Sequence, residues 1–285
     1  MTYRQLCTIL QDAHIENAEW DALCLMEHFC HISPSLLRID PDRDHPQDPA
    51  LMSAVSRRLA HEPLQYILGE WDFYRQKYEV SPDCLIPRSD TEILVDTAIR
   101  LLPHGARFAD LCTGSGCIAV STLAERPDTY AMALEKFPAT LAIAQKNAEK
   151  NQVTTRFCGI CADVLAPTPV DMTKTLFDAI LSNPPYIPTK DIAALSAEVQ
   201  KEPFAALDGG EDGLLFYRTI LKNYTPLLKK DGFFLFEIGF DQADALRALA
   251  EKHAIKQTHV IRDFGGNDRV VYLSNIPFNE RSHPL

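Results

Sequence analysis

Two regions of the 285-residue chain differ in the spacing of their hydrophobic positions. Up to about residue 75, apolar residues recur every three or four positions, as along one face of a helix. Four prolines between residues 34 and 49 separate these repeats. The pattern predicts a bundle of four or five short helices, then an extended segment with a hairpin over residues 71–86. Ser89 and Glu92 have the spacing of a capping box, which predicts a helix from there through Leu102.

After residue 105 the chain alternates between short apolar runs and longer helical patterns. Strands separated by helices imply right-handed crossovers and a mostly parallel sheet. The expected organisation is a helical domain over 1–75, a hairpin or linker over 76–90 and an α/β domain over 91–285. Strands are expected at 107–111, 130–134, 155–159, 177–182, 232–238, 259–263 and 270–273, and helices at 117–126, 138–151, 214–228 and 242–252.

Composition and charge add limits to this picture. Hydrophobic residues make up 46% of the chain and charged residues 24%, which is ordinary for a globular protein. No apolar run approaches the roughly 18 residues of a membrane span, and the N-terminus lacks the features of a signal peptide, so a cytoplasmic protein is expected. We also expect a monomer. The net charge is −11, whereas proteins that bind long nucleic acids usually have a basic surface. Stable nucleic-acid binding is therefore not expected, and a small-molecule or protein substrate is compatible with the charge.

The eight cysteines are scattered through apolar stretches of a long chain. Buried free thiols are expected. Cys158 and Cys161 form a C-x-x-C pair, but no second pair and no histidine at metal-ligand spacing accompany it. We expect these two to be small residues on or near a strand, and we expect no metal site.

A glycine-containing loop joins the first strand of the expected sheet to its helix. Its glycines allow a tight turn and a close approach of the backbone to a ligand. The second strand ends in Glu135, whose carboxylate can accept hydrogen bonds from two ribose hydroxyls. The same features fit a dinucleotide fingerprint, so the ligand is nucleotide-like and could be a nicotinamide or flavin cofactor or S-adenosylmethionine. The candidate cofactor-binding residues are Cys112, Thr113, Gly114, Ser115, Gly116 and Glu135.

Asp163 and Val164 follow the third expected strand. Asp163 can accept a hydrogen bond from an adenine amino group, with Val164 packed on the ring. Because aspartates are common in turns, a solvated loop residue is an equally good interpretation of Asp163.

The segment Asn183-Pro184-Pro185-Tyr186 follows the fourth expected strand, at the sheet edge where ligands bind in open α/β folds. Two consecutive prolines make a stiff backbone corner. The Asn183 side-chain oxygen and the Pro184 carbonyl can then accept the two hydrogens of a substrate NH₂ group and orient its lone pair for in-line attack on a methyl group. Tyr186 can stack on a flat amide and favour a methylsulfonium through its ring face. The segment predicts a methyltransferase that uses S-adenosylmethionine and modifies a planar amide or amine nitrogen; a proline-rich turn without chemistry is the alternative.

Over nearly its whole length the chain resembles the bacterial release factor glutamine methyltransferases. Asn-Pro-Pro-Tyr alone is shared with adenine amino-methyltransferases, whereas the segment Pro63–Gly69 is much more specific. The resemblance is carried by residues 62–74, 86–88, 110–119, 183–186, 209–213, 216–217, 237–239 and 268–271.

The resemblance implies a helical N-terminal domain that helps to hold the release factor, and a Rossmann-like domain that uses S-adenosylmethionine and releases S-adenosylhomocysteine. It implies that the target is the glutamine of the factor's Gly-Gly-Gln loop, and hence a role in translation termination. By this resemblance, residues 112–116, Glu135, Val164 and Asn183 contact the cofactor, and residues 183–186 hold the glutamine.

Two positions depart from the family pattern. Cys112 stands where the family usually has glycine; this change can alter the loop slightly, and it need not abolish cofactor binding if the backbone at this position is not left-handed. Ser89-Asp90 replaces Pro-Glu or Pro-Asp and keeps the acidic character.

Other functions remain open at this point. An adenine methyltransferase of nucleic acid would share the glycine loop and residues 183–186, but the first 75 residues contain 6 Lys or Arg against 12 Asp or Glu. That balance favours a module that faces a protein. A sister enzyme that modifies a ribosomal-protein glutamine is a closer alternative. A nicotinamide oxidoreductase would need a catalytic His, Lys or Tyr that we do not identify, and a non-enzymatic nucleotide-binding protein leaves the 183–186 corner without a purpose.

Overall fold

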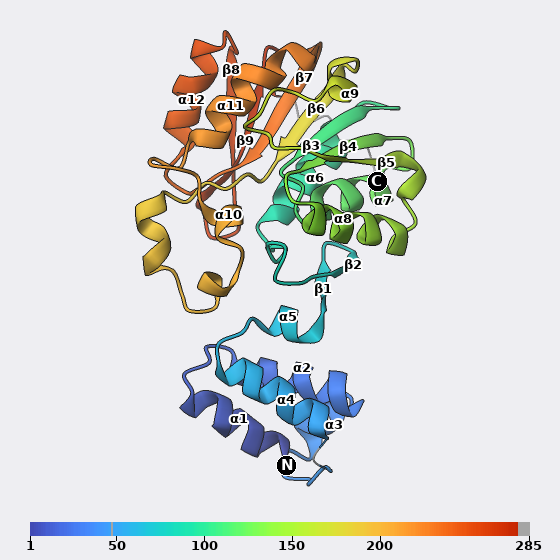
Figure 1. Ribbon diagram of the computed structural model, residues 1–285, viewed down its shortest axis with the longest axis vertical. Coiled ribbons are helices and arrows are strands. Elements are labelled where there is room, and N and C mark those ends of the chain that lie inside the picture. The colour runs from blue at the N-terminus through green and yellow to red at the C-terminus, as the bar shows by residue number, and fades with distance from the viewer. Residues whose placement is uncertain (47, 279–285) are drawn as a thin grey trace. The chain divides into compact units, whose positions relative to one another are not determined.

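The computed structural model describes residues 1–46 and 48–278 (Figure 1). Packing groups the described chain into two units. The first is Met1–Glu70 together with Leu195–Lys201, and the second is the rest of the described chain. No helix in the described part of the chain is both long and apolar enough to cross a membrane.

The first unit is helical, as its hydrophobic spacing predicts. Thr2 caps the first helix in a capping box with Gln5, so two free N–H groups at the helix start are satisfied. Leu6, Leu10 and Met26 are among the fully buried side chains of this unit. Its helices are α1 (Tyr3–Asp12), α2 (Ala18–Cys30), α3 (Pro34–Ile39), α4 (Pro49–Leu59) and α5 (Leu64–Leu68).

A buried arginine holds a distant segment in this unit. Arg58 is only 3% exposed, and its Nε donates to Asp21 Oδ2 at 2.6 Å. Its Nη1 donates to the Glu62 carbonyl, and its Nη2 pairs with Glu198. Glu198 lies in the Leu195–Lys201 segment, which the sequence pattern did not connect with the N-terminal helices.

The second unit contains a two-stranded hairpin and a seven-stranded sheet of order β5-β4-β3-β6-β7-β9-β8. Strands β3 to β7 pair in parallel, and β9 is antiparallel to both β7 and β8. A mostly parallel sheet was predicted and is confirmed. The strands are β1 (Glu70–Phe73), β2 (Gln76–Glu79), β3 (Arg107–Leu111), β4 (Tyr130–Glu135), β5 (Phe157–Cys161), β6 (Phe177–Ser182), β7 (Leu228–Glu237), β8 (Gln257–Arg262) and β9 (Asp268–Ser274), and the helices are α6 (Thr91–Leu101), α7 (Cys117–Glu125), α8 (Pro138–Lys150), α9 (Val170–Thr173), α10 (Phe204–Leu207), α11 (Leu215–Tyr224) and α12 (Ala243–Lys252).

Two apolar clusters lie on opposite faces of this sheet, because successive strand residues point to opposite sides. On β7, Phe233 and Leu235 join one cluster, and Phe234 and Phe236 join the other. The first cluster contains side chains of α6, α7 and α8, and the second contains side chains of α11 and α12. Figure 1 shows the same arrangement of helices on the two faces of the sheet. The second unit is therefore a three-layer α/β/α sandwich.

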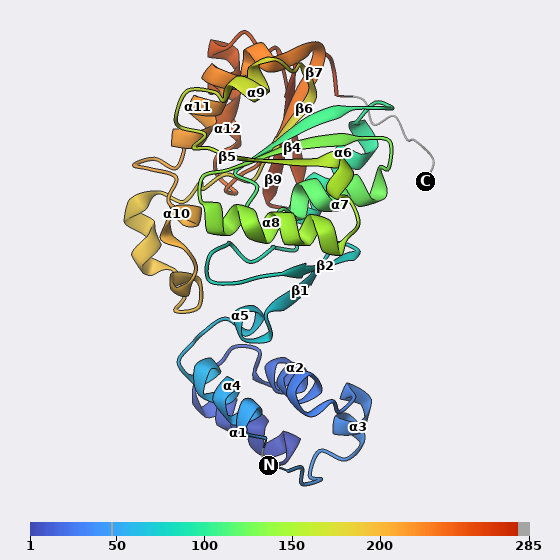
Figure 2. The same ribbon diagram turned by 45° about the vertical axis from the view of Figure 1, so that its right-hand side comes forward.

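The hairpin packs beside α8 (Figure 2). Asn147 of α8 bonds to both backbone groups of Glu79, accepting from its N–H at 2.7 Å and donating to its carbonyl at 3.0 Å. A second donation from Asn147 Nδ2 reaches the Ser115 carbonyl at 2.9 Å. The hairpin and the loop that contains Ser115 are thus held by one side chain.

The capping box predicted from Ser89 and Glu92 is wrong. Helix α6 begins at Thr91, and no side chain caps its first turn. Glu92 Oε1 instead accepts from the Tyr74 N–H at 2.8 Å, where the chain turns with φ 58°. The spacing alone could not reveal that the hairpin supplies a competing donor.

The cysteines are all free thiols, but they are not all buried. Cys7, Cys84 and Cys117 are buried, whereas Cys158 and Cys161 are exposed. The expectation that the thiols are buried is wrong for this pair, because β5 lies at the edge of the sheet with a neighbour on one side only. The expectation that the two residues lie on or near a strand is confirmed, since both belong to β5. Within the described residues, no group of three or more His, Cys, Asp or Glu is arranged to hold a metal ion.

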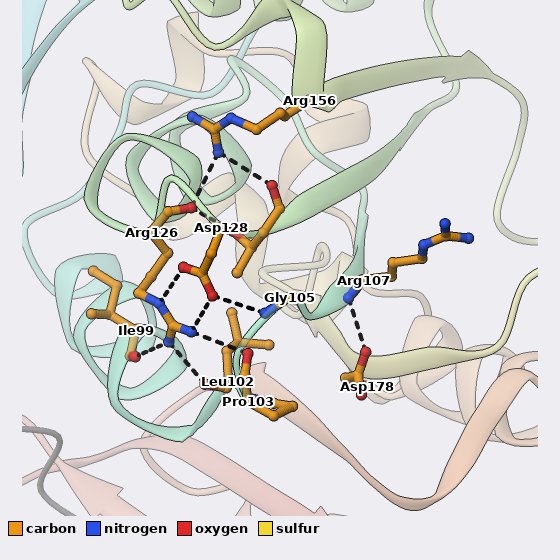
Figure 3. Close-up of polar contacts among 10 residues, drawn as sticks. Ile99, Leu102, Pro103, Gly105, Arg107, Arg126, Asp128, Arg156 and Asp178 are labelled. Carbon is orange, nitrogen blue, oxygen red and sulfur yellow. Dashed lines mark hydrogen bonds and ion pairs between the residues drawn. The ribbon is translucent and has the colours of Figure 1, made fainter.

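Near the edge of the sheet where the parallel strands begin, Arg126 contacts both the end of α6 and the turn before β4 (Figure 3). Its Nη1 donates to the carbonyls of Ile99 and Leu102 at 2.8 Å each, which satisfies free acceptors at the end of α6. It also forms two hydrogen bonds with Asp128, and this contact lowers the pKa of Asp128. These contacts join α6 to the turn before β4.

We expect Arg126→Ala to lower the free energy of unfolding by about 2–3 kcal/mol, because it leaves partly buried acceptors without a charged donor. Arg107→Ala is the matched control. The Arg107 side chain is exposed and points away from the cluster in Figure 3, where only its backbone N–H bonds to Asp178. The control should change the unfolding free energy by less than about 0.5 kcal/mol. If denaturant titrations show equal losses of unfolding free energy in the two variants, the contacts of Arg126 do not stabilise the fold as proposed.

Candidate functional site

The order of the strands creates a crevice at the carboxyl ends of β3 and β6. These two strands are neighbours, and the chain continues from them in opposite directions across the sheet. Ligands bind at such a switch point in open α/β sheets. The loops after β3 and β6 contribute to one cavity of about 380 Å³.

Nine of the twelve residues predicted to form the site line this cavity. They are Cys112, Thr113, Gly114, Ser115, Glu135, Asp163, Val164, Asn183 and Pro185. Gly116, Pro184 and Tyr186 are not among the lining residues. Gly116 instead allows α7 to pack closely on α8, because a Cβ at this position would lie 3.1 Å from Ala144 Cβ.

Asp110 holds the glycine loop in shape. The Thr113 hydroxyl and the Ala119 N–H both donate to Asp110 Oδ2, at 2.5 and 3.2 Å. Burial raises the pKa of this carboxyl group to about 7, although the two hydrogen bonds favour its charged form. Asp110, near the end of β3, therefore bonds to one residue before the two glycines and to one residue after them, in the first turn of α7.

Cys112 has a left-handed backbone with φ 60°. The expected condition for undisturbed cofactor binding, a backbone that is not left-handed at residue 112, is therefore not met. A residue with a Cβ pays about 1–2 kcal/mol in this conformation, which explains why glycine suits the position. The loop keeps the path that glycine would favour, with the side chain half-buried against the apolar cluster of α11 and α12.

The two acidic candidates face the cavity but already have partners. Glu135 accepts from the N–H groups of Gly114 and Phe137, both at 3.1 Å. Burial raises the pKa of Glu135, and these bonds partly oppose that shift. Asp163 accepts from the Leu165 N–H at 2.9 Å, as a turn aspartate does, and pairs with Lys136 at 2.9 Å. Asp163 is thus a turn residue that also lines the cavity.

Asn183 is oriented by a side chain from α6. Its Nδ2 donates to Thr91 Oγ1 at 3.1 Å. The Tyr186 hydroxyl lies 3.5 Å from Glu237 Oε1, and burial raises the pKa of Tyr186. The corner after β6 is therefore linked by polar contacts to both α6 and the end of β7.

The loop over residues 209–213 packs directly against the backbone of Tyr186, in the Asn183–Tyr186 corner. A Cβ on Gly213 would lie 2.3 Å from the Tyr186 carbonyl oxygen, and one on Gly209 would lie 2.7 Å from Tyr186 Cα. Gln242 Nε2 donates to the same Tyr186 carbonyl at 2.9 Å and its Oε1 accepts from the Gly239 N–H. The glycines permit direct contact between the loop and the corner.

Several lining residues were not assigned a role from the sequence. Phe204 and Phe216 line the cavity, as do Ile86 and Arg88. Glu202, which is 6% exposed, accepts from the Ile86 N–H at 3.1 Å and pairs with Arg88. The only available signal was the motif 86–88 itself, since its partner lies more than 110 residues away.

The sheet, the switch-point cavity and the rigid corner define a Rossmann-like methyltransferase. Two family models match the chain: the PrmC N-terminal domain over residues 2–69 and the methyltransferase small domain over residues 89–216. The release factor glutamine methyltransferase of Geobacter sulfurreducens is 38% identical over 268 residues, which cover 92% of this chain and 91% of that protein. The corresponding protein of Caulobacter vibrioides is 34% identical, with 92% and 91% covered. The chain belongs to the release factor glutamine methyltransferase family.

A solved structure supports the fold independently of this sequence similarity. The catalytic domain of hMettl16 in complex with MAT2A 3'UTR hairpin 1 matches with a TM-score of 0.57 at 13% identity, covering 81% of this chain and 83% of that one. At this identity the likeness concerns the fold alone.

Proposed function

We propose that the protein transfers a methyl group from S-adenosylmethionine to the side-chain amide nitrogen of the Gly-Gly-Gln glutamine in a peptide chain release factor. The observation that carries the proposal is that Asn183 opens onto the same cavity as the glycine loop and Glu135. The relatives' names supply the class of substrate. Because release factors act on ribosomes, the proposal places the enzyme in the cytoplasm.

The cavity residues fit S-adenosylmethionine. A volume of about 380 Å³ lies in the range of small-molecule sites. A Cβ added to Gly114 would meet no protein atom within 4 Å, so the loop leaves open space at this position. The Ser115 hydroxyl is buried without a hydrogen-bond partner in the described structure, which leaves a polar group for a ligand. When bound, S-adenosylmethionine supplies a methyl group already activated by its sulfonium charge.

The protein's own contribution is to position the nucleophile. An amide nitrogen is a poor nucleophile because its lone pair is delocalised into the carbonyl. In the proposal the Asn183 oxygen and the Pro184 carbonyl accept the two amide hydrogens, which holds the lone pair toward the methyl group. The amide nitrogen bonds to the methyl carbon as the sulfur–carbon bond breaks. S-adenosylhomocysteine is the leaving group, and the nitrogen releases one of its two protons to solvent. Tyr186 stacks on the amide plane.

Transfer of labelled methyl groups tests the proposal. Purified release factor should be labelled from S-adenosylmethionine, and the same factor with its Gly-Gly-Gln glutamine changed to alanine should not. A ribosomal protein and an adenine-containing oligonucleotide serve as competing substrates. Labelling that ignores the Gln→Ala change, or that favours either competitor, overturns the substrate assignment.

We expect Glu135→Ala to weaken the binding of S-adenosylmethionine by about 100-fold or more, since each of the two proposed hydrogen bonds to the carboxylate contributes about 1.5–3 kcal/mol. Glu135→Gln keeps one acceptor oxygen and should lose less. Glu149→Ala, an exposed position on α8, is the control and should bind normally. Isothermal titration calorimetry measures all three, and wild-type affinity in Glu135→Ala would remove Glu135 from the ligand site.

A further inference from the structure

Three polar side chains form a chain of hydrogen bonds that begins at the cavity, where Asn183 and Thr91 belong to the lining, and ends at the buried Glu237. Asn183 Nδ2 lies 3.1 Å from Thr91 Oγ1, and Thr91 Oγ1 lies 2.6 Å from Glu237 Oε2. Thr91 and Glu237 are each only 1% exposed, so solvent does not compete for these bonds. Asn183 alone of the three is half-buried.

The chemistry of these groups determines which atom donates and which accepts in each of these hydrogen bonds. An ionised carboxylate can only accept hydrogen bonds. The single hydroxyl hydrogen of Thr91 must then point to Glu237, so Thr91 Oγ1 meets Asn183 as an acceptor. Only the NH₂ side of the Asn183 amide can satisfy that acceptor. The Asn183 amide also lowers the pKa of Glu237 and so favours its charged form, which agrees with an NH₂ group on the side of Thr91.

We propose that Thr91 and Glu237 are positioning residues that orient the Asn183 side chain, so that its oxygen is left free to accept from the substrate amide. The proposal rests on the function proposed above. If Thr91 no longer accepts a hydrogen bond from Asn183, the Asn183 amide can rotate by half a turn and present its NH₂ group to the substrate. Two NH₂ groups would then face each other, and the substrate hydrogens would lose an acceptor.

The charge of Glu237 depends on the groups around it and on pH. Burial raises the pKa of Glu237 to about 7, while the bond from Thr91 and the nearby Arg269 lower it. Asp90 raises it from the start of α6, and the Tyr186 hydroxyl lies 3.5 Å away. Assays at pH 8.5 keep the carboxylate ionised.

Thr91→Val removes the hydroxyl and keeps the shape of the side chain. We expect its kcat to fall between about 10-fold and 100-fold, the scale of a misoriented reacting group. The KM for release factor and the affinity for S-adenosylmethionine should stay within about threefold of wild type. Thr91→Ser restores the hydroxyl and should recover most of the kcat.

Thr97→Val is the matched control on the same helix. Thr97 is also 1% exposed, but its hydroxyl bonds only to the Ile93 carbonyl in α6. This variant should lose about as much stability as Thr91→Val and keep its kcat. A merely structural role of Thr91 predicts the same kcat for both variants, and that result overturns the proposal.

A double-mutant cycle tests Glu237. Glu237→Met replaces the buried carboxylate by an apolar side chain of similar size, which buried ionic sites often tolerate. If Glu237 acts through Thr91, adding Thr91→Val to Glu237→Met should lower the kcat by less than about threefold further. Losses that multiply fully would mean that the two residues act separately, against the proposal.

A spectroscopic measurement separates this proposal from the proposed function. The ¹H–¹⁵N signals of the Asn183 side-chain amide, assigned with an Asn183 variant, should exchange slowly with solvent in wild type and Thr91→Ser, and faster in Thr91→Val. Unchanged exchange in Thr91→Val overturns the positioning role. Failure of the wild-type protein to label release factor overturns the proposed function and leaves this result standing.

Discussion

Replacing Asn183 by alanine should reduce the kcat for methyl transfer by about 10³-fold, comparable to the loss of one preorganised polar group in other active sites. The variant loses the acceptor proposed to orient the substrate amide. It also loses the bond from Nδ2 to Thr91, which should cost only about 1 kcal/mol of stability. The Thr91 hydroxyl keeps its bond to Glu237, so the local structure should persist.

The measurements are single-turnover methylation, thermal unfolding and calorimetric binding of S-adenosylmethionine. Asn223→Ala on α11 is the control; Asn223 is outside the cavity lining and should keep wild-type turnover. A folded Asn183→Ala variant with near-normal turnover would remove Asn183 from the proposed role. Loss of cofactor binding alone would instead make Asn183 a ligand-binding residue without an orienting role.

Replacing Gly213 by alanine should damage both stability and catalysis. The new Cβ would lie 2.3 Å from the Tyr186 carbonyl oxygen and 2.7 Å from Gln242 Nε2, and the backbone has φ +73°. The strain and the overlap together should cost about 2–4 kcal/mol. Relief of the overlap requires Tyr186 to move away from the loop, and a shift near 1 Å in a positioned group can cost about 10²-fold in rate.

Gly266→Ala separates these two effects. Gly266 also has a left-handed backbone, φ +85°, but a Cβ there meets no atom within 4 Å. The control should lose about 1 kcal/mol from the strained backbone alone and keep its kcat. If Gly213→Ala is destabilised and yet keeps its kcat within about threefold, the 209–213 loop does not support the catalytic corner.

The local pattern of the sequence was enough for most of the sheet. Strands β3 and β6 were predicted with the bounds that the structure has, because buried parallel strands are short apolar runs between turn residues. The first two residues expected in β5 form a 3₁₀ turn instead, Thr154–Arg156, so β5 begins at Phe157. The error at Ser89 and Glu92 arises because a local pattern does not include a competing partner from elsewhere in the chain, here the Tyr74 N–H.

The parts of the candidate site that could be predicted are those formed by residues close together in the sequence. The glycine loop and Asn183–Tyr186 are stretches whose backbone properties can be inferred directly from glycine and proline. Their meeting in one cavity follows from strand order, since β3 and β6 are neighbours at the point where the chain reverses direction.

The sequence by itself determined the alternation of strands and helices, the glycine loop and the proline corner, because each depends on residues close together in the chain. Only the tertiary structure decided how Asn183 is oriented and supported. Thr91 and Glu237 are 146 residues apart, and Thr91 and Asn183 are 92 apart. Such contacts leave no periodic signal, because they arise only when separate elements fold against one another. The left-handed backbone of Cys112 likewise follows from the path between β3 and α7, and its own residue type disfavours that conformation.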